Sequence, residues 1–381
     1  MNKLINKVEI TKPAKHVTFA YVGPLQSRGR LLKQIATLQS VGISCDVVLG
    51  NTLPEEPKPT DYYFPITSIA VGHNSGKLAS FSNQLRFCRA AAKIIAGGSA
   101  DTVVCVALEA LMAGVWAKRI RPSLRLVFDN NELHIECYGR GLKSFVWKLI
   151  HNYGVARSDV ILHAERNRME YFKKHYPGGA KPQLVIENFP FHGGEPTARP
   201  SPSDEVRVVY LGGFGYDRFT EDIILSFAKL PPSMKLDIIG FGRPEYLEHL
   251  RNITNNLGVA HVRLLPPVPY LKIPELLADY HIGVALYRNT NLNNYYCAPN
   301  KVYDYLMNGM PVITNRYPGL MSVIEANRVG VCIDEVGATE IREAIDVICR
   351  ERRWENITPE IRRRYCWEHQ VSDYLEVFGI S

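Results

Sequence analysis

The sequence predicts an α/β protein built from two doubly wound domains. Short apolar segments that suit buried parallel strands alternate with amphipathic helical segments through most of the 381 residues. A stretch rich in Gly, Pro and Ser at 191–203 separates two such series, and each series is long enough to enclose its own core. We therefore expect a first domain at 1–190 and a second domain at 205–357.

Composition narrows the class of protein. An apolar content of 46% and a charged content of 22% are typical of a soluble globular chain. No run of eighteen or more apolar residues suggests a membrane span, and residues 1–15 lack the apolar core of a signal peptide. The eight cysteines show no C-x-x-C spacing, which argues against a zinc site or a disulfide framework and fits the reducing cytoplasm.

Charge is distributed unevenly along the chain. Residues 1–190 hold 25 Lys and Arg against 14 Asp and Glu, whereas the remainder is slightly acidic. A basic first half indicates an anionic partner, such as the surface of an anionic membrane. The sequence has no basic–aromatic nucleic-acid motif, so we expect no nucleic-acid partner.

The first domain opens with a strand–loop–helix–strand pattern typical of a doubly wound sheet. Gly23 follows its first strand and Glu109 follows a later buried strand, at the strand ends where open α/β sheets bind ligands. Gly23 and Gly29 do not complete the G-x-G-x-x-G of a dinucleotide-binding loop, and Gly23 also suits an ordinary turn. The expected strands lie at 16–22, 44–49, 101–107, within 125–134, and at 158–163 and 184–188; the expected helices lie at 30–40, 77–96, 142–157 and 165–175.

Polar side chains cluster where the strand within 125–134 ends. Asp129, Asn131, Glu132 and His134 bring carboxylates, an amide and an imidazole together, as acid–base chemistry or hydroxyl recognition requires. The same residues also suit a simple turn. The expected helix at 142–157 carries aromatic residues beside cations, which is typical of a membrane interface and equally of a core-packed helix with a wet face.

The second domain repeats the pattern with glycine-rich strand ends. Gly213 follows a strand at 206–211, and Arg218 precedes a helix expected at 221–229, where its guanidinium could bind phosphate or lie in solvent. Gly240 and Gly242 end a strand at 235–242, and glycines there allow a ligand to approach the backbone. Further strands are expected at 282–287 and 330–334, a polar loop at 287–297, and a helix at 338–350.

The sequence at 299–315 predicts a helix followed directly by a buried strand. Pro299 suits the helix start, Gly309 suits a left-handed C-cap, and Pro311 prevents continuation. The free N–H groups at the start of this helix, with Lys301 in its first turn, suit a phosphate. Asp304 lies one turn further on and could accept hydrogen bonds from sugar hydroxyls; a helix packed on a sheet with both charges in solvent is the alternative.

This stretch resembles the donor-binding signature of glycosyltransferases with two Rossmann-like domains, and is most similar to glycosyltransferase family four. The family pattern S-P-x-K-x-x-E-Y-x-x-x-G-x-P-V-I is matched at Pro299, Lys301 and Gly309, with Asp304 in the place of the Glu. The family often carries a second acid eight positions earlier, where this chain has Tyr296. Many members have D-x-H-E where this chain has Asp129 to Glu132, with Asn131 in the His position.

The resemblance implies a fold and a set of site residues. The fold would be two facing Rossmann-like domains (GT-B) with a deep interdomain cleft and a C-terminal helix, at about 358–381, that crosses back to the first domain. The second domain would bind a UDP- or GDP-linked sugar, with no cofactor and no metal, since no D-x-D triplet occurs. The resemblance implies catalytic roles for Asp129, Glu132, Arg218 and Lys301; donor binding by Gly213, Arg218, Gly240, Gly242, Tyr296, Pro299, Asn300, Lys301 and Asp304; and an acceptor site at Gly23, Glu109, Asn131 and His134.

The function implied is transfer of a sugar from a nucleotide sugar to an acceptor hydroxyl, with retention of configuration. If the reaction inverts, Asp129 or Glu132 would be the base. The expected acceptor is a saccharide, and specifically a lipid-linked one of envelope polysaccharide or glycolipid synthesis, met in the cytoplasm or at the inner face of the membrane. Two alternatives stay open: a sugar-nucleotide epimerase or phosphorylase on the same fold, and a non-catalytic scaffold that binds nucleotide sugars.

Overall fold

The computed structural model describes residues 13–25, 28–51, 62–71, 77–137, 141–177, 179–193, 205–269 and 272–380. The chain forms two compact units: unit 1 is Met1–Glu187 with Gln370–Ser381, and unit 2 is Asn188–His369. The segment that returns to unit 1 is therefore shorter than the predicted 358–381, because residues up to His369 belong to unit 2. Most of the predicted linker at 191–203 lies outside the described residues.

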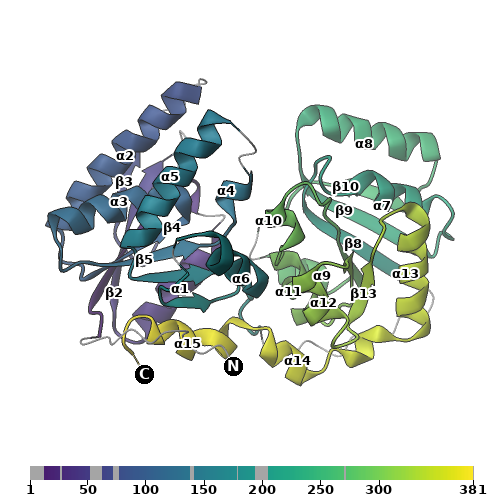
Figure 1. The fold of residues 1–381 in the computed structure, drawn as a ribbon. Helices are drawn as coiled ribbons and strands as arrows, with labels where there is room; N and C mark the ends of the chain where they lie inside the picture. The colour runs from purple at the N-terminus through teal and green to yellow at the C-terminus, as the bar shows by residue number, and fades with distance from the viewer. Residues whose placement is uncertain are drawn as a thin grey trace. The chain divides into compact units, whose positions relative to one another are not determined.

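Unit 1 contains a parallel sheet whose seven described strands follow the order β3-β2-β1-β4-β5-β6-β7 (Figure 1). Every residue of β4 is buried, as expected of a parallel strand covered by helices on both faces. The strands are β1 (His16–Val22), β2 (Ser44–Asn51), β3 (Ile66–Ala70), β4 (Thr102–Val106), β5 (Arg125–Asn130), β6 (Val160–His163) and β7 (Gln183–Val185); the helices are α1 (Gly29–Ser40), α2 (Lys77–Gly97), α3 (Ala107–Ile120), α4 (His134–Cys137), α5 (Leu142–Arg157), α6 (Arg166–His175) and α15 (Val371–Glu376).

Unit 2 contains a second parallel sheet, whose six described strands follow the order β10-β9-β8-β11-β12-β13. The strands are β8 (Val206–Gly213), β9 (Met234–Phe241), β10 (Val262–Leu265), β11 (Ile282–Ala285), β12 (Val312–Asn315) and β13 (Gly330–Ile333). The helices are α7 (Thr220–Phe227), α8 (Pro244–Leu257), α9 (Ile273–Leu277), α10 (Leu292–Tyr295), α11 (Asn300–Met307), α12 (Pro318–Ile324), α13 (Ala338–Arg350) and α14 (Pro359–Arg364), with 3₁₀ helices η4 (Arg353–Asn356) and η5 (Trp367–Gln370) at its C-terminal end.

Successive residues of β8 belong to different apolar clusters, one on each face of the sheet. Val209 and Leu211 pack with residues of α11 and α12, whereas Val208 and Tyr210 pack with residues of α7 and α13. This alternation follows from the two-residue period of a strand, and it explains why the buried residues 208–211 are all large and mainly apolar. Within the described residues, none of the helices has both the length and the apolarity needed to cross a bilayer.

Helix α11 begins and ends where its sequence predicts. Pro299 occupies the N-cap position with an extended backbone, so the helix starts one residue later. Gly309 has a φ of 69°, and the N–H groups that follow the helix donate back to its last turn, as in a left-handed C-cap. The ring of Tyr305 lies against β11 at Gly283, where a Cβ atom would come within 2.2 Å of the ring.

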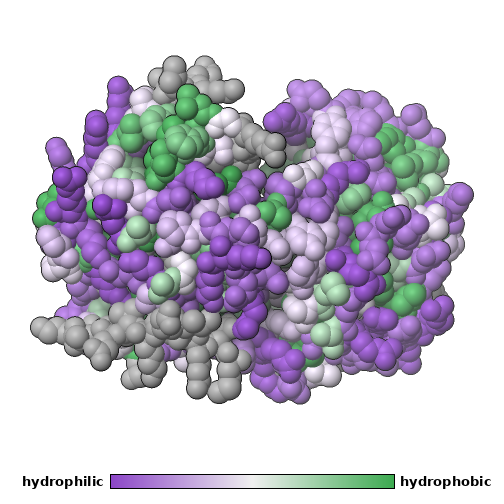
Figure 2. Space-filling model, in the orientation of Figure 1, coloured by the Kyte–Doolittle hydropathy of each residue, from purple (hydrophilic) through white to green (hydrophobic). Residues whose placement is uncertain are grey.

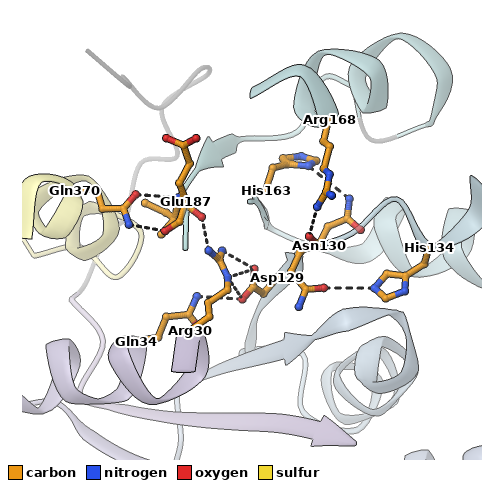
Figure 3. Close-up of polar contacts among 11 residues, drawn as sticks. Arg30, Gln34, Asp129, Asn130, His134, His163, Arg168, Glu187 and Gln370 are labelled. Carbon is orange, nitrogen blue, oxygen red and sulfur yellow. Dashed lines mark hydrogen bonds and ion pairs between the residues drawn. The ribbon is translucent and has the colours of Figure 1, made fainter. Parts of the chain in front are cut away.

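A buried ion pair joins three elements of unit 1. The guanidinium of Arg30, on α1, donates to both carboxylate oxygens of Asp129, at the end of β5, with an Nη2–Oδ1 distance of 2.8 Å (Figure 3). Gln34 donates to the same carboxylate at 3.0 Å, and Arg30 Nη1 also donates to the carbonyl of Ile186. The pair therefore fixes α1 and β5 to the segment through which the chain leaves unit 1.

Removing the charge of Asp129 should destabilise the fold. Asp129 is fully buried, so Asp129→Asn leaves the Arg30 guanidinium in the core without its anion, which costs about 3–5 kcal/mol. Urea unfolding measures the loss. The matched control is Asp334→Asn, which removes a mostly exposed carboxylate paired with Arg316 and should change stability by less than about 1 kcal/mol. Equal losses in the two variants would contradict the structural role of the buried pair.

Candidate functional site

The direction in which the chain adds strands to the sheet of unit 2 reverses between β8 and β11. These strands are neighbours, but the chain winds to β9 and β10 on one side and to β12 and β13 on the other. Ligands of open α/β sheets bind at the carboxyl ends of the strands at such a switch point. β8 ends at Gly212 and Gly213, so this edge of the sheet carries the first candidate site.

Two glycines shape this edge. Gly212 has a φ of 124°, a conformation that favours glycine. It pairs with Gly240 of β9, where a Cβ atom would lie 1.8 Å from the Gly212 carbonyl oxygen. Any larger residue at 240 would push β9 away from the end of β8. Gly242 lies against Phe214, and a Cβ atom added to Gly242 would lie 3.0 Å from the Cβ atom of Phe214.

Lys301 reaches this edge from the first turn of α11. Its ammonium lies 3.9 Å from the ring centre of Tyr210 and 5.4 Å from that of Tyr287. It also lies 3.3 Å from the position that a Cβ atom would take on Gly212. In the described part of the chain no carboxylate forms an ion pair with Lys301. The cation lies against the aromatic rings of Tyr210, within β8, and Tyr287, just after β11.

Arg218 lies over the same aromatic ring. Its guanidinium carbon is 4.4 Å from the ring centre of Tyr287, and it pairs with the neighbouring carboxylate of Asp217. The Tyr287 backbone is fixed in turn, because its N–H donates to Asn315 Oδ1 at 2.7 Å and its carbonyl accepts from the Tyr317 hydroxyl at 2.7 Å. Two cations predicted from separate motifs are thus brought together on one tyrosine.

The electrostatics of the pair follow from this arrangement. Burial and, to a smaller extent, the nearby charge of Arg218 lower the pKa of Lys301 from its ordinary value to about 7. A lysine with a pKa near 7 loses its proton easily at neutral pH, and a bound anion would favour the protonated form. The two cations, the free N–H groups at the start of α11 and the exposed glycine backbone together suit a diphosphate.

The other predicted donor residues lie around α11. Asn300, its first residue, accepts a hydrogen bond from Asn188 at 2.7 Å. Tyr296 stands edge-on to Tyr295, with their ring centres 4.9 Å apart, just before Pro299. Asp304 is only 9% exposed, so it is far less open than a residue lining a cleft. Its predicted contact with a ribose stays a prediction.

Unit 1 has an equivalent switch point between β1 and β4. Gly23 follows β1 with a φ of 127°, and its Cβ position is 2.7 Å from the Tyr21 hydroxyl, which in turn accepts a hydrogen bond from Arg28 Nε at 2.6 Å. Burial lowers the pKa of Arg28, but the Tyr21 hydroxyl and the carboxylates of Glu132 and Glu109 outweigh it and raise the pKa overall. The charges of Glu109 and Glu132 therefore both act on Arg28.

The structure corrects the role expected of Asp129. Its carboxylate is fully buried and occupied by Arg30 and Gln34, so it has no free position from which to take a proton from an acceptor. Glu132, three residues later, is partly exposed and is the carboxylate of this cluster that an acceptor can reach. We assign Asp129 a structural role.

Asn131 and His134 lie together next to Glu132. The Asn131 side-chain oxygen is 3.4 Å from His134 Nε2, and its backbone carbonyl accepts from Arg168 at 2.7 Å (Figure 3). Asn130 points away from this group, toward His163. Burial lowers the pKa of His163 to about 3, so this imidazole is neutral and belongs to the core.

Sequence reasoning missed four residues of these sites: Tyr210 and Tyr287 in unit 2, and Arg28 and Arg168 in unit 1. A usable signal was present for the tyrosines, since Tyr210 lies within β8 and Tyr287 follows β11, the two strands that flank the switch point. Arg28 and Arg168 have no local signal, because their partners come from other parts of the chain. In the described residues no group of three His, Cys, Asp or Glu side chains could hold a metal ion.

Comparison with known proteins identifies the fold. Residues 195–364, which lie in unit 2, match the family described as glycosyl transferases group 1, and no curated protein matches the sequence. Sucrose-phosphate synthase from Thermosynechococcus elongatus has a TM-score of 0.78 to this structure at 14% identity, covering 96% of this chain and 100% of that one. Anabaena HepE in complex with UDP and glucose has a TM-score of 0.73 at 15% identity, covering 96% and 99%. The lipopolysaccharide outer core galactosyltransferase WaaB has a TM-score of 0.70 at 12% identity, covering 96% and 100%. The predicted fold, two Rossmann-like domains of the GT-B type, is confirmed.

Lys301 should make stability depend on pH. Between pH 7 and 10.5 the unfolded lysine keeps its proton while the folded one has lost it, so unfolding takes up a proton and stability rises with pH. Below pH 7 both states are protonated and the dependence disappears. Urea unfolding of the wild type and Lys301→Met, at about pH 6 and about pH 9, should show the wild type gaining up to about 1.4 kcal/mol per pH unit relative to the variant. A difference that does not change with pH would show that the lysine is not perturbed.

Proposed function

We propose that this chain, whose second unit is a glycosyl transferases group 1 domain within a GT-B fold, transfers a sugar from a nucleotide sugar to an acceptor hydroxyl. The family match and the fold support glycosyl transfer. Structures of HepE contain UDP and glucose or UDP-glucose, and they support the class of donor that we propose here. UDP- and GDP-linked sugars are both compatible with the site.

One observation carries the proposal: Lys301 is a partly buried cation without a carboxylate in the described structure, and Arg218 lies on the same tyrosine. Two cations held close together repel each other, and an anion that bridges them relieves this repulsion. A diphosphate carries the matching charge and can accept from the guanidinium at two oxygens. Binding would also raise the pKa of Lys301 from about 7, so above neutral pH the site takes up a proton with its ligand.

The same groups supply a mechanism. As the bond between the sugar and the diphosphate breaks, negative charge builds up on the leaving oxygen. We propose that Lys301, Arg218 and the start of α11 would stabilise this charge, and that the reaction therefore needs no metal. On the resemblance to family four we propose retention of configuration. Should the reaction invert, Glu132 is the base, because Asp129 is occupied.

For the acceptor we propose a lipid-linked saccharide met at an anionic membrane. Helix α5 exposes an apolar stripe of Leu142, Phe145, Leu149 and Tyr153, which are between 39% and 79% exposed. Figure 2 shows the corresponding green surface near the top of unit 1. Exposed Lys148 and Arg157 accompany the stripe, and residues 1–190 are basic. Trp147 is one of the aromatic residues for which the sequence of this helix suggested a membrane interface, but it packs onto the core of unit 1.

Replacing either cation should weaken binding of the nucleotide diphosphate. Loss of a charged hydrogen-bond partner costs about 1.5–3 kcal/mol, so Arg218→Ala and Lys301→Met should each raise the Kd for UDP or GDP by about 10- to 100-fold. Titration calorimetry in EDTA measures this and tests metal independence in the same experiment. Lys235→Met is the control, because this lysine lies at the start of β9, at the opposite end of the strands of unit 2, and pairs with Glu205. Wild-type affinity in both site variants would show that Arg218 and Lys301 do not bind the diphosphate.

Activity is measured with a nucleotide sugar, with and without a lipid-linked acceptor. The proposal requires a glycosylated product, whereas isomerised nucleotide sugar alone would indicate an epimerase. Binding without any turnover of the donor would indicate a scaffold.

The apolar stripe of α5 should govern membrane binding. The double variant Phe145→Ser, Leu149→Ser should lose most binding to phosphatidylglycerol vesicles, because both apolar side chains insert at the interface. Wild-type binding should fall with salt, since each cation near an anionic surface contributes about 1 kcal/mol that salt screens. Ile120→Ser is the control, an exposed apolar residue of unit 1 on α3. Binding to phosphatidylcholine vesicles as strong as to anionic ones, or unchanged in the double variant, would refute this surface.

A further inference from the structure

A cavity of about 540 Å³ opens at the amino edge of the sheet of unit 1. It lies at the starts of β1 and β2 and beside the turn between α2 and β4, so it is at the opposite end of the strands from Gly23 and Glu109. Its volume is within the range of small-molecule sites. Its wall is partly apolar, from Pro65, Ile94 and Ile95, and its polar lining includes His16, Asp46 and Ser99.

The polar lining contains a serine–histidine–aspartate array. His16 Nδ1 is 2.8 Å from Ser99 Oγ, and His16 Nε2 is 3.0 Å from Asp46 Oδ1. Thr18 also donates to Asp46 Oδ1, at 2.6 Å, so the carboxylate is fixed by two neighbours. A proton on Nε2, shared with Asp46, leaves Nδ1 as an acceptor facing the hydroxyl of Ser99. These are the contacts by which a base activates a nucleophile and a carboxylate orients the base.

The turn that carries Ser99 is held rigidly. Arg121 donates to the carbonyls of Gly98 at 2.5 Å and Ile95 at 3.2 Å, and also to that of Ala100. The N–H groups of Ser99 and Ala100 donate to no other group in the described chain. An amide of the nucleophilic residue itself is a common donor to the oxyanion of acyl transfer. Ser99 is exposed, so a reagent can reach it.

We propose that Ser99, His16 and Asp46 form a second reactive site, which takes small esters with an apolar acyl group. Ser99 Oγ bonds to the carbonyl carbon while its proton moves to His16 Nδ1. The carbon–oxygen bond to the leaving alcohol then breaks, and the alcohol oxygen takes that proton. Water, deprotonated by His16, releases the acid and regenerates Ser99, so the balance is ester and water to acid and alcohol. The acyl group lies against Ile94 and Ile95.

This site does not depend on glycosyl transfer, so it is tested separately. The full chain is incubated with an alkyl fluorophosphonate, which bonds covalently to activated serines, and is then analysed by intact-mass spectrometry and peptide mapping. The expected result is one adduct, on Ser99, and none in Ser99→Ala. Ser44→Ala is the matched control: Ser44 lines the same cavity, no described imidazole bonds its hydroxyl, and its loss should leave labelling unchanged.

The roles of the partners are tested by rate. His16→Gln and Asp46→Asn should each slow labelling, His16→Gln by about 100-fold, because a positioned base contributes at least that much. Hydrolysis of p-nitrophenyl butyrate should fall in the same order. No adduct on the wild type, an adduct on another residue, or wild-type rates in His16→Gln would each overturn the proposal. The wild-type measurement needs no variant, so an unstable His16→Gln protein does not leave the question open.

Discussion

The buried pair of Arg30 and Asp129 is the constraint on which unit 1 depends. A charge pair with side chains at most 6% exposed is stable only when its geometry and hydrogen bonds are complete, and Gln34 and the Ile186 carbonyl complete them. Arg28 lies two residues before Arg30, and Glu132 lies three residues after Asp129. The pair therefore sets the distance between the cation and the carboxylate of the candidate acceptor site while taking no part in the chemistry itself.

In unit 2 the phenol group of Tyr305 makes the buried polar contact that positions a cation. The Tyr305 hydroxyl accepts a hydrogen bond from the N–H of Leu211 at 3.0 Å, and its ring needs the space that Gly283 leaves. Lys301 lies one helical turn before Tyr305, on the same face of α11. Leu211 directly precedes Gly212, so one buried hydrogen bond aligns the lysine with the glycine-rich strand end. In both units a buried polar contact, one turn or less away, positions a cation.

What could be predicted from the sequence was local. Pro299, Gly309 and Pro311 define α11 within a residue, and the strand and glycine patterns bring Arg218 and Lys301 to one edge of a sheet. The role of Asp129 could not be predicted, because its partner is 99 residues away and an acid after a strand looks the same whether it is free or paired. Tyr210 and Tyr287 were missed because an aromatic residue in or next to a buried strand is typical of the core. The return to unit 1 begins at Gln370, whose side-chain amide bonds the Glu187 backbone in both directions, and nothing in the local pattern marks that pairing.

The choice of aromatic rings as neighbours for Lys301 has a chemical consequence. A carboxylate would neutralise the lysine and would have to be displaced before a diphosphate could bind. A tyrosine ring attracts a cation through its quadrupole, by about 0.5–2 kcal/mol, and carries no charge that competes with an incoming anion. Arg218 is paired with Asp217, but its guanidinium still faces Tyr287. The rings thus hold both cations in place without a carboxylate that neutralises Lys301, and the resulting repulsion is relieved either when Lys301 loses its proton or when an anion binds.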